Sequence, residues 1–259
     1  MKRTLIAAVF ALSASTAFAG PSTDVLQIVT DVQEALNRID ILSSGTNIAQ
    51  DAVNAANLIS VEGAQIDDVA QIGFLTTQVA KNVAISEWSS FTNLDQAATN
   101  VLNSVDAGKI DNILQGALGD QYASNYVQFD DLDLAPFDLD NDMSHVKQAA
   151  TNVANTISAT TLEGFTIQLA AVDQDAINSA VGAGTAGLWP ADVSNLTQEA
   201  VNAANLVSVG TLPSNFSVLP DIVQVGIADQ VASNTLAASV KVNTAVQSAT
   251  NVVNSISLD

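Results

Sequence analysis

Small and apolar residues alternate with amides along most of this 259-residue chain. With a period of two, residues 96–105 place Gln, Ala, Asn, Leu and Ser on one face and Ala, Thr, Val, Asn and Val on the other. The Thr, Val and Ile residues of such segments favour strands, and two partly apolar faces are typical of a strand inside a stacked coil. We therefore expect an all-β fold, a β-solenoid of stacked strand–turn–strand coils.

The alternative interpretation is that the same segment forms a helix. With a period of 3.6 residues, an apolar stripe forms from Leu94, Ala98, Val101, Leu102 and Val105. Alanine is a good helix former, but Asn, Thr and Val are not, and the chain has few Lys/Glu pairs for an exposed helix face. An all-α tandem helical repeat is therefore the less favoured fold.

The motif Gln-x-Ala-x-Asn occurs ten times, in two alternating kinds. One kind is preceded by a further Gln, as Gln27 precedes Gln33, and the other is followed by a second Asn, as Asn57 follows Asn54. Sorting by these flanks predicts one repeat domain, residues 20–259, built of double repeats near 27–60, 71–106, 115–158, 168–208 and 224–257. Two wider gaps carry insertions near 126–144 and 182–197, which we expect to be loops on one face.

Stacked coils would align each motif position with its equivalent about 4.8 Å away. Identical amides at that spacing donate to and accept from one another, and the alanine between them leaves room in a narrow interior. The expected ladder residues are Gln33, Asn37, Gln50, Asn54, Gln78, Asn82, Gln96, Asn100, Gln121, Asn125, Gln148, Asn152, Gln174, Asn178, Gln198, Asn202, Gln230, Asn234, Gln247 and Asn251. Because stacked carboxylates repel, we expect Asp and Glu in loops or at unaligned positions.

The first nineteen residues have the pattern of a bacterial secretory signal. A basic start is followed by an apolar stretch and by Ala17-Phe18-Ala19 before Gly20. We expect cleavage at Ala19-Gly20 and a secreted or cell-surface protein. No later segment is long and apolar enough to span a membrane, so we expect no transmembrane segment in the mature chain.

Charge and composition exclude several function classes. The chain has 7 basic and 27 acidic residues, and cleavage would remove two of the basic ones, leaving a formal charge of −22. Such a chain is unsuited to nucleic acid, which requires Lys and Arg to displace counterions, and to anionic membranes. There is no cysteine and one histidine, His145, which we expect at the surface. With no Ser-His-Asp, Gly-x-Ser-x-Gly or His-Glu-x-x-His pattern, we expect no enzyme activity.

Two patterns in the insertions are candidate binding sites. The residues Asp138, Asp140 and Asp142 alternate as in a calcium loop, although Met143 stands where a glycine and Ala149 where an acidic residue is expected. Calcium is thus the sole cofactor candidate, and a solvated acidic loop is the alternative. The glycines of Gly182-Ala-Gly184-Thr-Ala-Gly187 match a dinucleotide-binding spacing but run into Trp189-Pro190, so we expect a flexible loop there.

The first kind of motif, Gln27-x5-Gln33-x-Ala35-x-Asn37 and its four counterparts, resembles the repeats of curlin-type functional-amyloid subunits. The resemblance covers nearly the whole mature chain, but alanine stands where curlins favour glycine, and the repeat is a double unit. It implies export through a dedicated outer-membrane pore and self-association into an adhesive surface fibre. The first hypothesis is thus a subunit or accessory of an extracellular fibre, biofilm matrix or attachment structure.

The second hypothesis is a monomeric cell-surface binding module. Its insertions would recognise a glycan, a protein or calcium, and its repeats would serve only as scaffold.

Overall fold

The computed structural model describes residues 13–14, 24–41, 45–86, 91–131, 143–184, 192–210, 221–238 and 241–258. The strands are β1 (Ser13–Ala14), β2 (Asp24–Val29), β3 (Val32–Ile41), β4 (Gly45–Ser86), β5 (Phe91–Asp131), β6 (Met143–Leu162), β7 (Phe165–Gly184), β8 (Asp192–Val209), β9 (Asp221–Ala238), β10 (Lys241–Val242) and β11 (Ala245–Leu258). The predicted β-solenoid is confirmed and the helical alternative is wrong. Within these ranges the protein has no helix capable of crossing a membrane.

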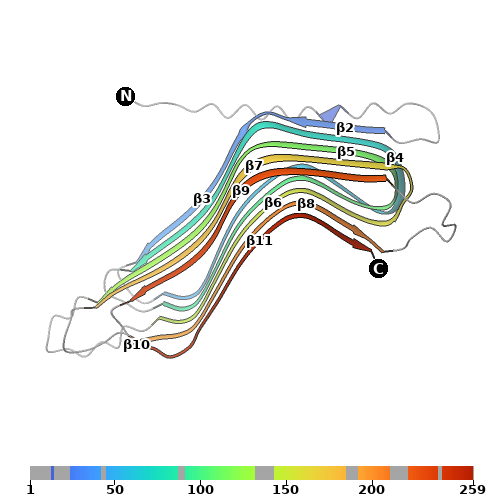
Figure 1. Cartoon of the computed structure of the whole chain (residues 1–259). Coiled ribbons are helices and arrows are strands. Elements are labelled where there is room, and N and C mark those ends of the chain that lie inside the picture. The colour runs from blue at the N-terminus through green and yellow to red at the C-terminus, as the bar shows by residue number, and fades with distance from the viewer. Residues whose placement is uncertain are drawn as a thin grey trace, which may run out of the picture.

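The strands form two stacks that face each other (Figure 1). We name them from their places in Figure 1. The upper stack holds residues 24–41, 65–86, 109–131, 165–184 and 221–238. The lower stack holds residues 45–61, 91–107, 143–159, 192–209 and 241–258. At the end of β6, Thr161 and Leu162 pair with Lys109 and Ile110 of the upper stack. Neighbours within a stack are parallel, and β4 and β5 each turn a corner from the lower into the upper stack.

The register aligns equivalent motif positions from coil to coil. Each coil consists of one upper strand with the first kind of motif and one lower strand with the second. In the lower stack Gln50 pairs with Gln96, and the alignment continues through Gln148, Gln198 and Gln247. The motif alanines of both stacks pack together in one buried cluster, so the two backbones approach closely there.

Larger apolar side chains fill the interior toward the two ends of the strands, on either side of the alanine cluster. One cluster contains Ile110, Ile113 and Leu162, and the cluster near the opposite end contains Phe91 and Phe129. A Cβ added to Gly182, which is paired in register with Phe129, would collide with the ring. Gly182 therefore makes room for Phe129 at the end of β7, and the flexible-loop expectation is wrong for residues 182–184.

The period of two breaks at two positions of the lower strands, where residues adopt a positive φ. The first break lies at Asn47, Asn93, His145 and Asn195, and the second lies at one asparagine in every lower strand. Asn103 has a φ of 59°, in the left-handed region that asparagine tolerates better than most residues. The inward face of this strand therefore runs through Gln96, Ala98 and Asn100 but then takes Asn103 and Val105, while Ser104 turns outward. The face assignment by strict alternation is wrong beyond Leu102, because one residue in the left-handed conformation shifts the pattern by one position.

Acidic residues do align in two places, so the expectation that stacking would exclude them is wrong there. Asp120, Asp173 and Asp229 are in-register neighbours on the upper stack, and all three lie on its outer side. Asp24 pairs with Asp68, whose carboxylate accepts a hydrogen bond from Asn112 at 2.8 Å. Water and counterions screen carboxylates at the surface, and the amide partner offsets part of the repulsion at Asp68.

Candidate functional site: the amide ladders and their ends

Six ladders of amide side chains run through the solenoid along the stacking direction. Each has four side-chain hydrogen bonds, of 2.5 to 3.0 Å, that connect all five coils. All twenty residues expected from the motif lie in four of these ladders, which begin at Gln33, Asn37, Gln50 and Asn54. In the middle coils the ladder side chains are fully buried, so the bonds satisfy polar groups that water cannot reach.

The other two ladders were not among the expected residues. They begin at Gln27 and Asn57 and are built from the glutamine before the first kind of motif and the second asparagine of the other kind. The signal was present, because those flanking residues are the ones that distinguish the two kinds of repeat. A shorter exposed run starts at Asn47, which accepts a hydrogen bond from Asn93 at 2.9 Å.

The glutamine and asparagine ladders have opposite polarity. In the glutamine ladders the later coil donates to the earlier one, as Gln121 Nε2 donates to Gln78 Oε1 at 2.7 Å. In the asparagine ladders the earlier coil donates to the later one, as Asn82 Nδ2 donates to Asn125 Oδ1 at 2.9 Å. All twelve bonds of each kind follow the same direction.

Backbone carbonyls of the facing stack determine this polarity. Gln78 Nε2 also donates to the carbonyl of Val101 at 3.0 Å, and Asn82 Nδ2 to that of Ala97 at 2.6 Å. Rotating either amide by 180° would place its oxygen against a carbonyl oxygen, which is unfavourable in a buried site. The direction of each ladder is therefore a property of the fold.

The two ends of the solenoid consequently carry complementary unused groups. In the first coil, Gln27, Gln33 and Gln50 each donate to one backbone carbonyl and keep a second amide hydrogen. In the last coil, the oxygens of the equivalent glutamines accept no hydrogen bond among the described residues; these are Gln224, Gln230 and Gln247.

The asparagines at the two ends are also complementary, with the roles of donor and acceptor reversed relative to the glutamines. In the first coil, the Oδ1 atoms of Asn37, Asn54 and Asn57 accept no hydrogen bond within the described ranges. In the last coil, Asn254 accepts from Asn205 at 2.8 Å but its amide group makes no donation to a described residue. A last coil placed against a first coil would thus extend all six ladders with donors facing acceptors.

Apolar side chains accompany these amides at both ends. Leu36 and Val53 in the first coil and Val231 and Val246 in the last coil are about half exposed. Part of the first edge is covered by β1, which pairs antiparallel with β2 through Ser13–Gln27 and Ala14–Leu26. β1 lies within the segment expected to be cleaved.

The few basic residues include a lysine that forms surface ion pairs. Lys109 Nζ, at the corner where the third upper strand begins, lies 3.0 Å from Glu163 and 3.4 Å from Asp111. The hydrogen bond to Glu163 raises the pKa of Lys109 above its ordinary value, and the charge of Asp111 adds to this effect. The contact joins neighbouring coils at the corner, and it persists until the pH rises above the ordinary lysine range.

The remaining sequence candidates do not form a site among the described residues. Asp138, Asp140 and Asp142 lie outside those residues. His145 is exposed, as expected, and lies 3.4 Å from the amide of Asn195. Of the two insertions, residues 126–131, 143–144, 182–184 and 192–197 belong to strands, and within the described ranges no three His, Cys, Asp or Glu residues could hold a metal ion.

Comparisons with protein-family models, with curated proteins and with solved structures find no match to this chain.

Proposed function

We propose that this protein is an exported structural subunit that stacks head to tail into an extracellular fibre, of a biofilm matrix or attachment structure. The observation that carries the proposal is the complementarity of the two end coils. Six half-satisfied amides at one end match six at the other in position and in hydrogen-bonding sense. Head-to-head contact would instead oppose glutamine donors to donors and asparagine acceptors to acceptors.

The backbone supports the same arrangement. An end strand presents unpaired N–H and C=O groups that template the addition of another strand unless they are covered. A copy placed head to tail would continue the parallel pairing already present between every two coils. Removal of the leader, including β1, would uncover the β2 edge, which links assembly to export and cleavage.

The ladder interior also favours a structural role over catalysis. Its polar side chains are amides, which neither donate nor accept protons in general acid–base chemistry near neutral pH. The net charge of −22 expected for the mature chain keeps separate copies apart at low ionic strength, and salt screens this repulsion.

Asn254→Asp tests the head-to-tail contact without disturbing the monomer. Its Oδ1 already accepts from Asn205 at 2.8 Å and a carboxylate can do the same, while the unused Nδ2 donor at the open end is lost. The next copy would then bring the Asn57 oxygen against a carboxylate. We expect elongation of residues 20–259 to slow by roughly tenfold or more, since an unsatisfied buried group costs about 1–3 kcal/mol.

Ser257→Asp is the matched control, because it adds the same charge to the same coil on the outward face, where Asp106 already occupies the equivalent rank. Elongation measured by light scattering should be close to wild type for Ser257→Asp. Equal rates for the two variants, with equal melting temperatures, would contradict the ladder-mediated contact.

A further inference from the structure

The outer surface of the upper stack carries a continuous apolar face. Two outward ranks run in register through all five coils and a third runs through the four coils from Phe74 to Ile227, and all three contain only apolar residues or glycine. Leu75 lies beside Phe74 at a register shift and is exposed as well. We call these residues the apolar face, and its members are Leu26, Ile28, Ala70, Ile72, Phe74, Leu75, Leu114, Gly116, Leu118, Ile167, Leu169, Ala171, Val223, Val225 and Ile227.

This face reaches the surface in both end coils and in the coils between them. Ile227 is 74% exposed, Leu75 65%, and Phe74 and Leu169 are close to half exposed although they lie in interior coils. The outer surface of the lower stack differs, since its aligned ranks include Thr99 with Thr151 and Asp95 with Lys147. Soluble monomers rarely expose contiguous apolar patches larger than a few hundred Å², and larger ones mark interaction surfaces.

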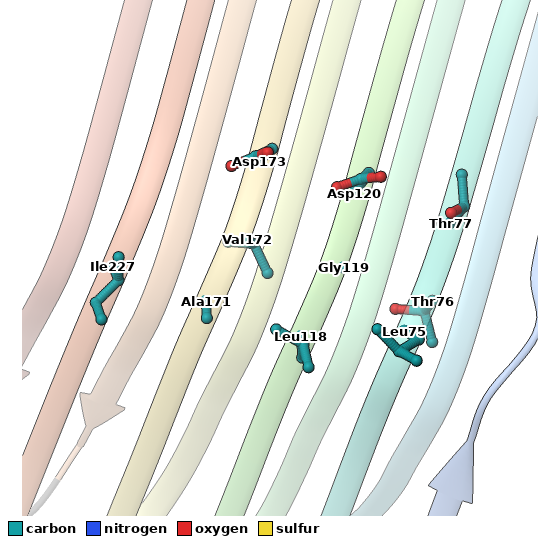
Figure 2. Close-up of a pocket in the computed structure, with 10 residues that line it drawn as sticks. All are labelled: Leu75, Thr76, Thr77, Leu118, Gly119, Asp120, Ala171, Val172, Asp173 and Ile227. Carbon is teal, nitrogen blue, oxygen red and sulfur yellow. The ribbon is translucent and has the colours of Figure 1, made fainter.

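A shallow trough forms one border of the apolar face. Figure 2 shows Leu118, Ala171 and Ile227 in a row across the strands, with Asp120 and Asp173 in a parallel row beside them. The trough has a volume of about 410 Å³. Carboxylates along the edge of an uncharged apolar centre correspond to the anatomy of a protein interface, with its apolar core and polar rim.

We infer that the apolar face pairs with the same face of a second copy of this chain, so that two stacked columns associate sheet on sheet. Such sheets pack about 10 Å apart through interdigitated side chains. A second copy fits because the face offers no charged or hydrogen-bonding side chain to a polar ligand, whereas an identical apolar face requires none. The inference deepens the proposed function and rests on it.

The size of the apolar face explains why chains should pair only once they have stacked into columns. Five coils at ~4.8 Å and three ranks about 7 Å apart give a patch on the order of 24 Å by 20 Å. This is roughly 500 Å² per copy, below the ~800 Å² per partner of a standard stable interface. Head-to-tail stacking repeats the patch in every subunit and makes it continuous along the column, so single chains should not pair but stacked columns should.

Mass per length of unstained fibres of residues 20–259, measured by scanning transmission electron microscopy, tests the pairing. The expected value is two chains per ~24 Å of fibre, because one chain contributes five coils at ~4.8 Å. A value of one chain per ~24 Å would overturn the inference and leave the proposed function standing. Failure of the wild-type chain to form any fibre would contradict the proposed function, and the pairing with it.

A triple variant tests whether the apolar face is the surface through which the columns pair. Phe74→Thr, Leu169→Thr and Ile227→Thr keep the preference for strands but remove apolar area from three coils. We expect fibres of one chain per ~24 Å with an elongation rate within about twofold of wild type. The control, Val201→Thr, changes the outer side of the lower stack at a position aligned with Thr151 and Thr250 and should keep two chains. Two chains per repeat in the triple variant would also overturn the inference.

Discussion

At the scale of single residues, the solenoid depends on satisfying amides that the chain buries. Gln121 shows how this is done, since it donates to Gln78 at 2.7 Å and to the carbonyl of Val153 at 3.1 Å and accepts from Gln174 at 2.6 Å. Glutamine and asparagine suit this role because each offers two donor hydrogens and an acceptor in one planar group. A charged residue at the same position would meet an identical charge in each neighbouring coil.

Thr166 is an exception to the rule that buried polar side chains are hydrogen-bonded, and it provides a test of that rule. Its hydroxyl is buried with no hydrogen-bond partner, in a rank whose other members are Val25, Val69, Ile113 and Ile222. We expect Thr166→Val to stabilise the protein by about 1 kcal/mol, because it removes an unsatisfied group and keeps the shape. The control Thr151→Val, on the outer lower face, should change the free energy of unfolding by less than about 0.5 kcal/mol in urea. A loss of stability in Thr166→Val would show that the hydroxyl has a partner.

At the scale of the strand, one column of asparagines combines a bend with a ladder. Five asparagines at equivalent positions have φ between 53° and 60°; they are Asn57, Asn103, Asn155, Asn205 and Asn254. Every lower strand therefore changes at the same position which of its side chains face inward. Asparagine accepts this conformation more readily than most residues and uses its amide to bond the neighbouring coils. The column therefore keeps five lower strands in the same shape.

Substitutions at Asn155 can separate the bend from the ladder. Asn155→Gly and Asn155→Ala both lose the bonds to Asn103, Leu169 and Asn205, but only alanine also bears the cost of a left-handed backbone. We expect the alanine variant to be less stable than the glycine variant by about 1 kcal/mol in urea denaturation. At Ser158, outward on the same strand, the order should reverse by about 0.5–1 kcal/mol, because glycine weakens an extended strand. The same order of stability at both positions would contradict the role of the bend.

The sequence was sufficient to predict the strands, the motif ladders and their spacing, because an amide repeated at a fixed offset indicates that equivalent positions stack. It could not predict which residues beyond Leu102 face inward, since the shift at Asn103 depends on one backbone dihedral angle. It was also a poor guide to acidic residues. Asp120 and Asp173 align because an outer surface tolerates stacked carboxylates that an interior would exclude.

At the scale of the whole molecule, the polarity of the ladders is the property that no single repeat reveals. A single motif does not define a direction, because each amide can both donate to and accept from its equivalents in the neighbouring coils. Only the bonds to the facing stack, such as Gln78 to Val101 and Asn82 to Ala97, give glutamine and asparagine opposite directions. The ends are therefore distinct and complementary, which permits open-ended growth by a heterologous contact.

X-ray diffraction from aligned fibres of residues 20–259 tests this claim most directly. Continuous stacking predicts a meridional reflection near 4.7–4.8 Å together with a subunit repeat near ~24 Å along the same axis, because five coils separate equivalent groups. A protein that stays monomeric at high concentration and in salt, or fibres that lack the reflection near 4.7–4.8 Å along their axis, would contradict head-to-tail assembly through the ladders.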